Sequence, residues 1–360
     1  MKTSVSQRAP RLVALLALAL ATLSASNLSA QNATVTTVPV GAVTVTINPA
    51  VGAARRLTTL SFPLSDDSVI SGQQRGQITS ITATTITNSN AGWTAGQLST
   101  SAAAAPNLIQ MTSGAEIGRT FLISVTAANT ATTLTIDSVE SGLVNLTTTG
   151  IVAGDTYRII ACDTLASIFG GPQQSGIIAN ADGALADQVK VLVGTAYRTY
   201  HHNGTNWVRL GVGTVSNNIA IRPDSMVIFS RVSTTAMSLT FVGTVPSVNR
   251  KAIVRNAGLS TLSTSWPMTR TLGDTNLQNL SGWVNSNTAG TTTSATDVVQ
   301  VLVGSAYRTY CYNGTQWVRA NVGTASNSVS IPAGSGVIVN KKSGSSGTSL
   351  AVAQTIPYTL

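Results

Sequence analysis

The chain of 360 residues has little charge, few aromatic side chains, and only two histidines and two cysteines. Charged residues make up 9% of it and aromatic residues 5%, and its histidines are the neighbours His201 and His202. Neighbours on a strand point to opposite faces, so this pair is poorly placed to hold one metal ion, and no carboxylate or cysteine cluster supplies further ligands. The basic excess is too dilute for a nucleic-acid-binding surface. These shortages predict a protein without a metal, a cofactor or a nucleic-acid partner.

The sequence also lacks a convincing acid–base pair. General acid–base catalysis needs two titratable side chains in environments that tune them. Asp66 and Asp67 stand at a predicted domain junction, where a turn is the better interpretation. Asp187 and Asp297 each open a predicted strand, where an aspartate usually caps or turns the backbone. We therefore expect a non-enzymatic protein.

The two cysteines, Cys162 and Cys311, have a spacing that fits no metal-binding motif. Two cysteines outside the cytoplasm can oxidise, so one disulfide between them is an alternative. The favoured interpretation is a pair of buried thiols that do not bond to each other.

The first thirty residues have the pattern of a secretory signal peptide. A basic start is followed by an apolar run at 12–23, which is too short to span a bilayer, and by small residues at 24–30. Cleavage after Ala30 would leave 18 basic and 12 acidic residues, and would place the protein in the periplasm, at the cell surface or in the medium. An uncleaved N-terminal anchor is the alternative. No later run reaches about 20 apolar residues, so no membrane span is expected in the mature chain.

Alternating strand patterns dominate the rest of the chain. Residues 33–47 alternate valine with threonine, and residues 130–137 and 218–230 alternate in the same way. This period of two predicts antiparallel strands with one buried face, and hence an all-β fold. A helical turn is expected only at 163–170. The strand at 33–47 is a candidate for pairing with an open sheet edge of another molecule.

An internal repeat organises these strands. Residues 191–209 match residues 301–319 without a gap, and the match continues from 212–221 to 322–331. It predicts a duplicated antiparallel domain of the β-sandwich or jelly-roll type, interrupted in its first copy by a small β-barrel. The predicted bounds are 1–30 for the signal peptide, 31–66 plus 162–250 for the first copy, 67–161 for the inserted barrel and 251–360 for the second copy.

The most strongly repeated stretch is a predicted hairpin around Asn203 and Gly204, which favour a two-residue turn. Such a turn places Arg198 opposite Arg209, Tyr200 opposite Trp207, and His202 opposite Thr205. All six share one face, and the other face, with Tyr197, Thr199, Val208 and Leu210, is expected to lie on the core. The same count in the second copy pairs Arg308 with Arg319 and Tyr310 with Trp317.

Facing arginines beside aromatic rings suit two interpretations. Either the arginines stack on the rings for structural reasons, which is the commoner outcome, or the face binds an anion or an acidic sugar. The candidate ligand-binding residues are Arg198, Tyr200, Trp207, Arg209, Arg308, Tyr310, Trp317 and Arg319.

Motifs throughout the mature chain resemble a paralogous family of uncharacterised secreted proteins found mainly in verrucomicrobial bacteria. The motifs include "TVPVGAVTVTI", "WTAGQL", "GAEIGRTFLI", "GDTYRII", "TLASIFG", "ADQVKVL" and the closing "IPYTL", in the family's order. The resemblance implies a signal peptide, the split duplication and β structure, but no activity or catalytic residue. Because a tryptophan is common in the family where Cys162 stands, the resemblance assigns that cysteine no shared role.

These features together predict a secreted, non-enzymatic structural or adhesive protein of the cell surface that associates with itself. The alternative is a module that binds carbohydrate or polyanions, such as cell-envelope glycans, through the paired Arg/Tyr/Trp faces. A glycan-cleaving enzyme or lyase is a weaker third candidate, since arginine and tyrosine can serve in lyases.

Overall fold

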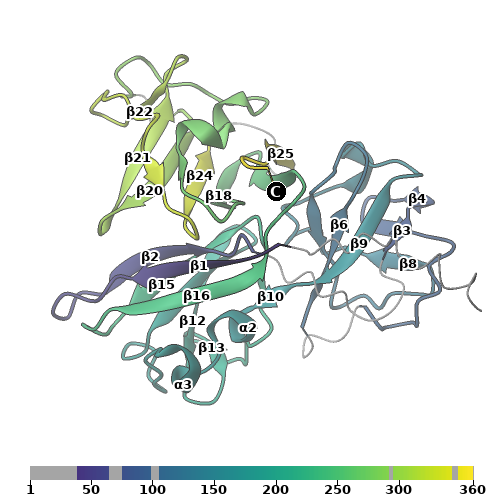
Figure 1. Cartoon of the computed structure of the whole chain (residues 1–360), viewed down its shortest axis with the longest axis horizontal. Helices are drawn as coiled ribbons and strands as arrows, with labels where there is room; N and C mark the ends of the chain where they lie inside the picture. Colours follow the sequence, from purple (N-terminus) through teal and green to yellow (C-terminus); the bar gives the residue numbers. More distant parts are fainter. Residues whose placement is uncertain (1–38, 65–74, 99–104, 292–294, 343–347, 360) are drawn as a thin grey trace, which may run out of the picture. The chain divides into compact units, whose positions relative to one another are not determined.

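The computed structural model describes residues 39–64, 75–98, 105–291, 295–342 and 348–359 (Figure 1). The predicted signal peptide and the Asp66-Asp67 pair lie outside the described residues. Strands make up most of the regular structure, so the predicted all-β class is confirmed. No helix among the described residues is long and apolar enough to cross a membrane.

The first sandwich-like layer pair is built from residues on both sides of the 75–161 segment. A five-stranded antiparallel sheet has the order β13-β12-β11-β15-β2, and the β1-β16 ribbon packs on one face of it. Ile47, Leu60, Phe229 and Trp207 are among the buried side chains between the layers. The strands are β1 (Val40–Ile47), β2 (Arg56–Ser61), β11 (Gln188–Val193), β12 (Ala196–His202), β13 (Trp207–Arg209), β15 (Met226–Arg231) and β16 (Met237–Thr244).

The second layer pair repeats this arrangement. Its five-stranded sheet has the order β18-β24-β20-β21-β22, and a β17-β25 ribbon shares its apolar core. Val189 faces Tyr200 in the first sheet, and Val299 faces Tyr310 in the second. The strands are β17 (Arg250–Arg255), β18 (Gly258–Ser263), β20 (Val298–Val303), β21 (Ala306–Tyr312), β22 (Trp317–Arg319), β24 (Gly336–Lys341) and β25 (Ser349–Gln354). The likeness accords with the sequence repeat, while the duplication and its exact domain bounds stay predictions.

The two five-stranded sheets contact each other through equivalent positions. Ser61 N donates to Gly334 O at 2.8 Å, and Ser263 N donates to Asp224 O at 3.0 Å. Positions 224 and 334 are 110 residues apart, which is the spacing of the sequence repeat. A small apolar cluster fills the contact: Met226, Ile228 and Ile338, with Leu57, Tyr197, Leu259 and Tyr307 packed against them.

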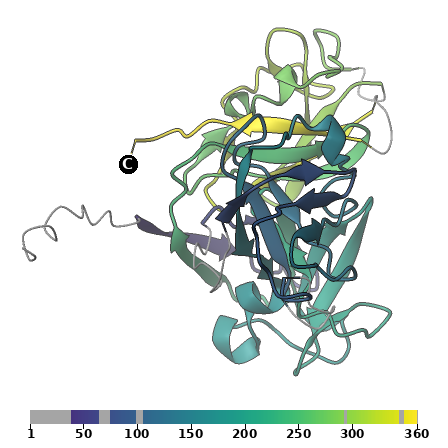
Figure 2. The ribbon, with the colours of Figure 1, turned by 90° about the vertical axis from the view of Figure 1, so that its right-hand side faces the viewer.

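Residues 75–161 form strands around an apolar core of their own (Figure 2). One sheet has the order β3-β9-β6-β7 and another the order β4-β5-β8. Ile109, Phe121 and Tyr157 lie at the centre of this core and are almost completely buried. Closure into a barrel stays a prediction. The strands are β3 (Arg75–Gln77), β4 (Ser80–Ile81), β5 (Thr85–Thr87), β6 (Asn107–Met111), β7 (Thr120–Leu122), β8 (Thr133–Thr135) and β9 (Thr156–Ala161).

Short elements complete the described fold. The predicted helical turn is confirmed as α2 (Leu165–Phe169), which begins at a capping box between Thr164 and Ser167. A second short helix, α3 (Pro172–Ser175), follows. The remaining elements are the pairs β10 (Asp163–Thr164) with β14 (Ala220–Ile221) and β19 (Arg270–Thr271) with β23 (Ser330–Ile331), and the 3-10 turns η1 (Leu146–Thr148), η2 (Gly273–Thr275) and η3 (Leu277–Asn279).

The predicted hairpin exists, but its predicted register is wrong by two residues. Tyr200 lies opposite Arg209, and His202 lies opposite Trp207. The cause is Asn203, whose side-chain oxygen accepts hydrogen bonds from the backbone N–H groups of Thr205 and Asn206, at 2.9 and 2.8 Å. This side-chain turn lengthens the loop to residues 203–206. A shift of two keeps each residue on its predicted face.

The same correction applies to the arginine pairs of both hairpins. Arg209 lies opposite Tyr200, so it does not face Arg198 across the hairpin, and Arg198 pairs with Val191 of β11 on the other side of its strand. In the second hairpin, Tyr310 lies opposite Arg319, while Arg308 lies opposite Val301. The predicted directly opposed like-charge pairs are therefore not present.

The N-terminal alternating strand has a partner within its own chain. All eight residues of β1 pair with β16, from Val40 opposite Thr244 to Ile47 opposite Met237. Self-association was expected because this strand could pair with a sheet edge of another molecule. In the structure, β16 already pairs with one of the two edges of β1. Self-association accordingly stays a prediction without support from this feature.

Candidate functional site

The aromatic members of the predicted ligand faces lie in the cores of the two layer pairs. Tyr200 and Trp207 are each 1% exposed, and Tyr310 and Trp317 are equally inaccessible. The Trp207 ring packs against the Phe169 ring at 5.7 Å between centroids, and its indole N–H donates to Gly170 O at 2.9 Å. These rings form no platform on which a sugar could stack.

The prediction of the core side of the hairpin is also wrong. Leu210, expected to lie on the core, is 40% exposed, whereas Tyr200 and Trp207 of the other face are buried. The β1-β16 ribbon covers the face that carries these rings. Val208 is buried as well, so burial on both sides obscures the alternation that the prediction used.

The arginines differ from the aromatic residues and between the two hairpins. Arg198 and Arg209 are half-buried, whereas Arg308 and Arg319 are exposed. The predicted structural stacking of these arginines on rings is not found, because the cation–π contacts of the described residues belong to Arg119, Arg250 and Lys341.

Arg198, Tyr200 and Arg209 line one cleft of about 580 Å³. They reach it from β12 and β13, and the segment 214–219 forms much of the remaining wall. Val125, from the 75–161 segment, completes the lining. Within the described part of the chain, neither guanidinium has a carboxylate within 4.0 Å. The cleft therefore presents two positive charges without a contacting counter-charge.

The hydroxyl of Tyr200 adds a polar group to this cleft. It is buried and has no hydrogen-bond partner among the described residues. Burial raises the pKa of the phenol, while the charges of Arg198 and Arg209 oppose that rise and Glu140 adds to it. Arg198 is near enough to favour the ionised form, but it makes no hydrogen bond of acceptable geometry with the hydroxyl. At neutral pH the hydroxyl is protonated, but its burial leaves no surface on which a ligand in the cleft could contact it.

The segment 214–219 is held firmly against β13. Asn217 accepts the backbone N–H of Trp207 at 2.9 Å and donates to Asn206 at 2.9 Å. Ser216 N donates to Trp207 O, and Val215 bridges to Val208. The equivalent asparagine of the second hairpin, Asn327, accepts from Trp317 N at 2.8 Å. The wall of the cleft is thus part of the fold rather than a loose loop.

Asp187 and Asp297 have a role that sequence reasoning missed. Asp187 accepts from Arg231 at 2.6 Å, from Ile178 N at 3.0 Å and from Val232 N at 2.8 Å. The predicted interaction with the backbone is therefore present, together with an ion pair in which both side chains are buried. Asp297 repeats this arrangement with Lys341. The signal was available, because a basic residue follows each aspartate by 44 positions.

The two cysteines are free and buried, so the alternative of a disulfide is contradicted. Cys162 packs with Leu108, Leu122 and Ile160, and Cys311 belongs to a separate apolar cluster. Burial raises the pKa of the Cys162 thiol, with the charge of a neighbouring aspartate adding to the rise. A neutral thiol among aliphatic side chains is chemically inert.

Both histidines are buried. The Nδ1 atom of His202 accepts from Gly204 N at 3.1 Å, and its ring meets the edge of Trp207. No group of three or more potential metal-ligating side chains occurs in the described ranges.

Comparison of the chain with protein-family models, with curated proteins and with solved structures finds no match. The cleft must therefore be interpreted from its own chemistry.

Proposed function

We propose that this chain is an exported, non-enzymatic adhesive protein that holds anionic groups of an acidic polysaccharide in the cleft of Arg198, Tyr200 and Arg209. The observation that carries the proposal is the pair of half-buried guanidinium groups in one cleft, neither of which has a carboxylate within 4.0 Å among the described residues. A carboxylate or sulfate accepts from guanidinium groups in a fixed planar geometry.

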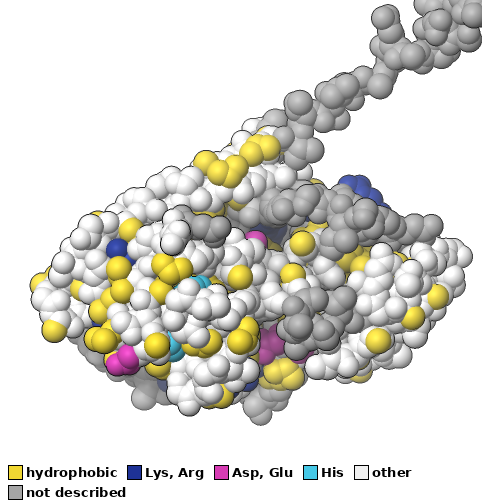
Figure 3. All heavy atoms as spheres, turned by 90° about the horizontal axis from the view of Figure 1, so that it is seen from below, with side chains coloured by type: hydrophobic (Ala, Val, Ile, Leu, Met, Phe, Trp, Pro, Cys, Tyr) yellow, Lys and Arg dark blue, Asp and Glu magenta, His cyan; other side chains and the backbone are white. Residues whose placement is uncertain are grey.

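The size and surroundings of the cleft support a polymer segment rather than a single ion. A volume of about 580 Å³ lies in the range of sites that hold drug-sized ligands. The exposed side chain of Thr214 lies along the wall, where it can contact a sugar hydroxyl, while the Ser216 hydroxyl and the Asn217 amide are bonded within the protein. The surface in Figure 3 is mostly uncharged, with few arginine or lysine side chains, so binding would depend on a local site rather than on a general positive field.

The buried rings narrow the ligand class. A sugar ring cannot stack on Tyr200, Trp207, Tyr310 or Trp317, because these rings have no accessible surface. The buried rings therefore offer no binding surface to neutral glycans. The second hairpin has exposed arginines, and the segment 75–161, through Val125, lines the cleft of the first hairpin. We accordingly assign the binding role to the first hairpin alone.

The test compares two variants of equal charge change. Replacing Arg198→Gln together with Arg209→Gln is expected to weaken binding to polygalacturonate or heparin about tenfold or more, because each charge-assisted hydrogen bond contributes about 1.5–3 kcal/mol. Replacing Arg308→Gln together with Arg319→Gln removes the same charge from exposed positions and is expected to change affinity less than about twofold. Isothermal titration at fixed salt measures both.

Dextran serves as the uncharged probe and is expected not to bind. The proposal fails if the wild-type chain binds neither acidic polymer, or if the two double variants lose affinity equally, since equal losses would mean that only net charge matters. Tyr200→Phe serves as a control inside the cleft and should leave the affinity unchanged, because the ring is kept and the hydroxyl that it removes is buried.

A further inference from the structure

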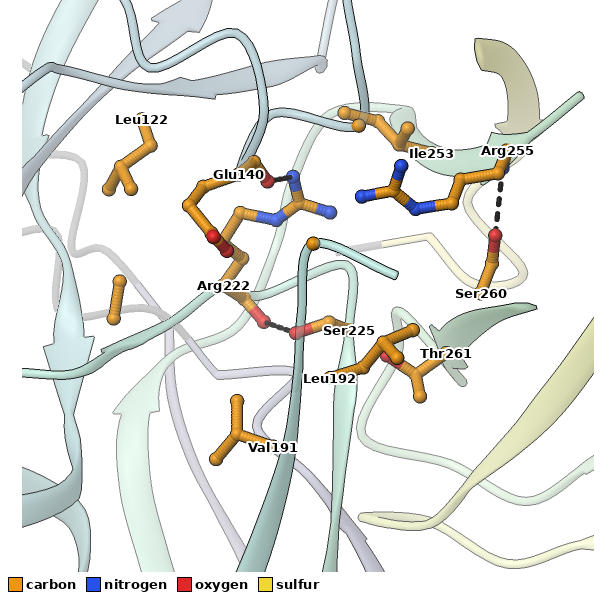
Figure 4. A pocket seen from close by; sticks show the side chains of 13 residues that line it. Leu122, Glu140, Val191, Leu192, Arg222, Ser225, Ile253, Arg255, Ser260 and Thr261 are labelled. Atoms are coloured by element: carbon orange, nitrogen blue, oxygen red, sulfur yellow. Dashed lines mark hydrogen bonds between the residues drawn. The ribbon is translucent and has the colours of Figure 1, made fainter. Parts of the chain in front are cut away.

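A second, much smaller cavity lies where residues 122–142, the end of β11, the end of β14, β17 and β18 meet. Its volume is about 50 Å³, and its lining includes Glu140, Arg222, Ile253 and Arg255 (Figure 4). It shares no lining residue with the cleft of Arg198. A cavity of this size holds a monatomic ion or a few water molecules but excludes a sugar ring.

Two guanidinium groups face each other across this cavity (Figure 4). Arg222 donates to the main-chain oxygen of Glu140 and pairs with Asp224 at 3.0 Å. Arg255 is 6% exposed, its Nη2 atom makes one long hydrogen bond of 3.4 Å to Val139 O, and its Nη1 atom is buried with no partner. Burial lowers the pKa of Arg255 and the charge of Arg222 lowers it further, while the charge of Glu140, which also lines the cavity, opposes both effects without contacting the guanidinium.

The carboxylates near the cavity leave the charge of Arg255 without a contact. Asp224 is engaged with Arg222 and with the backbone N–H of Ile253 at 3.0 Å. Burial, with the charge of Asp137, raises the pKa of Glu140, although Arg222, Arg198 and Arg255 oppose that rise. In the described part of the chain no carboxylate lies within 4.0 Å of the Arg255 guanidinium. A buried cation in this state is destabilising unless a counter-charge approaches it.

We infer that this cavity binds one small inorganic anion of the chloride class between Arg222 and Arg255. The anion accepts from the Nη1 atom of Arg255, which otherwise has no partner, and screens the repulsion between the two guanidinium groups. Because its lining comes from five stretches of the chain, at 122–142, 191–194, 220–225, 253–255 and 260–261, the anion holds these stretches together. The site is independent of the proposed polysaccharide cleft.

Thermal unfolding of the whole mature chain tests this inference. Sodium chloride is compared with sodium gluconate at equal ionic strength, because gluconate is too large for the cavity. Chloride is expected to raise the melting temperature by about 2–4 °C beyond gluconate in a saturable way, as mass action requires for a ligand of the folded state. Arg255→Gln should abolish the difference between the two salts, whereas Arg308→Gln, which removes an exposed arginine, should retain it.

Crystals soaked in bromide supply a second measurement that does not depend on a variant. An anomalous peak between Arg222 and Arg255 supports the inference. Identical melting curves in chloride and gluconate, or bromide-soaked crystals with no peak at this position, would overturn it. A peak without any chloride-specific stabilisation would identify an adventitious ion only and would also overturn it.

Discussion

Removing the carboxylate of Asp297 should lower the free energy of unfolding of this chain by a large fraction. The side chains of Asp297 and Lys341 are both 0% exposed, and their charged atoms are 2.7 Å apart. The carboxylate also accepts Val284 N at 2.9 Å and Lys342 N at 2.7 Å. Asp297→Ala therefore leaves one buried ammonium and two backbone N–H groups without their acceptor.

The expected loss follows from these contacts. Breaking a buried ion pair from one side costs about 3–5 kcal/mol, which is a large share of a typical stability of about 5–15 kcal/mol. After the substitution, Lys341 keeps only Gly282 O at 3.0 Å and the Trp283 ring at 5.2 Å. Asp187→Ala should cost about 1 kcal/mol less, because Arg231 retains hydrogen bonds to two main-chain oxygens, and each such bond is worth about that amount.

Urea denaturation followed by tryptophan fluorescence measures both losses, since urea does not screen charge. Adding Lys341→Met to Asp297→Ala should recover part of the stability, because it removes the stranded charge but leaves the two N–H groups unpaired. The reasoning is refuted if Asp297→Ala costs less than about 1 kcal/mol, or if the double variant is no more stable than the single one.

Two further predictions concern titratable groups. Burial, with the neighbouring His201, lowers the pKa of His202. As the pH drops below about 6.5 the unfolded chain therefore takes up the proton before the folded chain does, and stability should fall. His202→Tyr should flatten the dependence of the unfolding free energy on pH between about pH 5 and 7, and an unchanged slope would contradict this. Burial raises the pKa of Tyr197 to about 12 and also raises that of Tyr307, so the unfolded chain ionises first and stability should fall as the pH rises above about 10. Because both hydroxyls are buried without a partner, the double variant Tyr197→Phe with Tyr307→Phe should lose less stability above about pH 10 and should be as stable as the wild type near neutral pH. A decrease of more than about 1 kcal/mol in the unfolding free energy, measured by thermal unfolding at about pH 7, would contradict this prediction.

The strands were predictable because alternation and turn residues are local properties. The helical turn at 163–170 was predictable for the same reason, since Thr164 and Ser167 carry the capping signal themselves. The hairpin register was not, because it depends on how many backbone N–H groups the Asn203 side chain accepts. Periodicity does not reveal such a count.

The face of the hairpin that joins the core was unpredictable for a different reason. A strand with one wet face shows its burial by alternation, but here Tyr200 and Val208 point to opposite sides and both are buried. The candidate cleft was only half predictable. Arg198 and Arg209 were identified from the repeat, whereas their meeting with Val125 depends on a segment distant in sequence.

The pairing of β1 with β16 has a consequence for the order of events during synthesis. Val40 cannot pair until Thr244 has been synthesised, because these residues face each other across the ribbon. At about 5–20 residues per second, the first strand stays without its partner for roughly 10–40 s. In the second layer pair the wait is about half as long, since Arg250 faces Gln354. During this interval the uncharged Val/Thr strand is exposed to mispairing with other nascent chains, and residues 75–161, which lie between the two paired strands, nearly double its length.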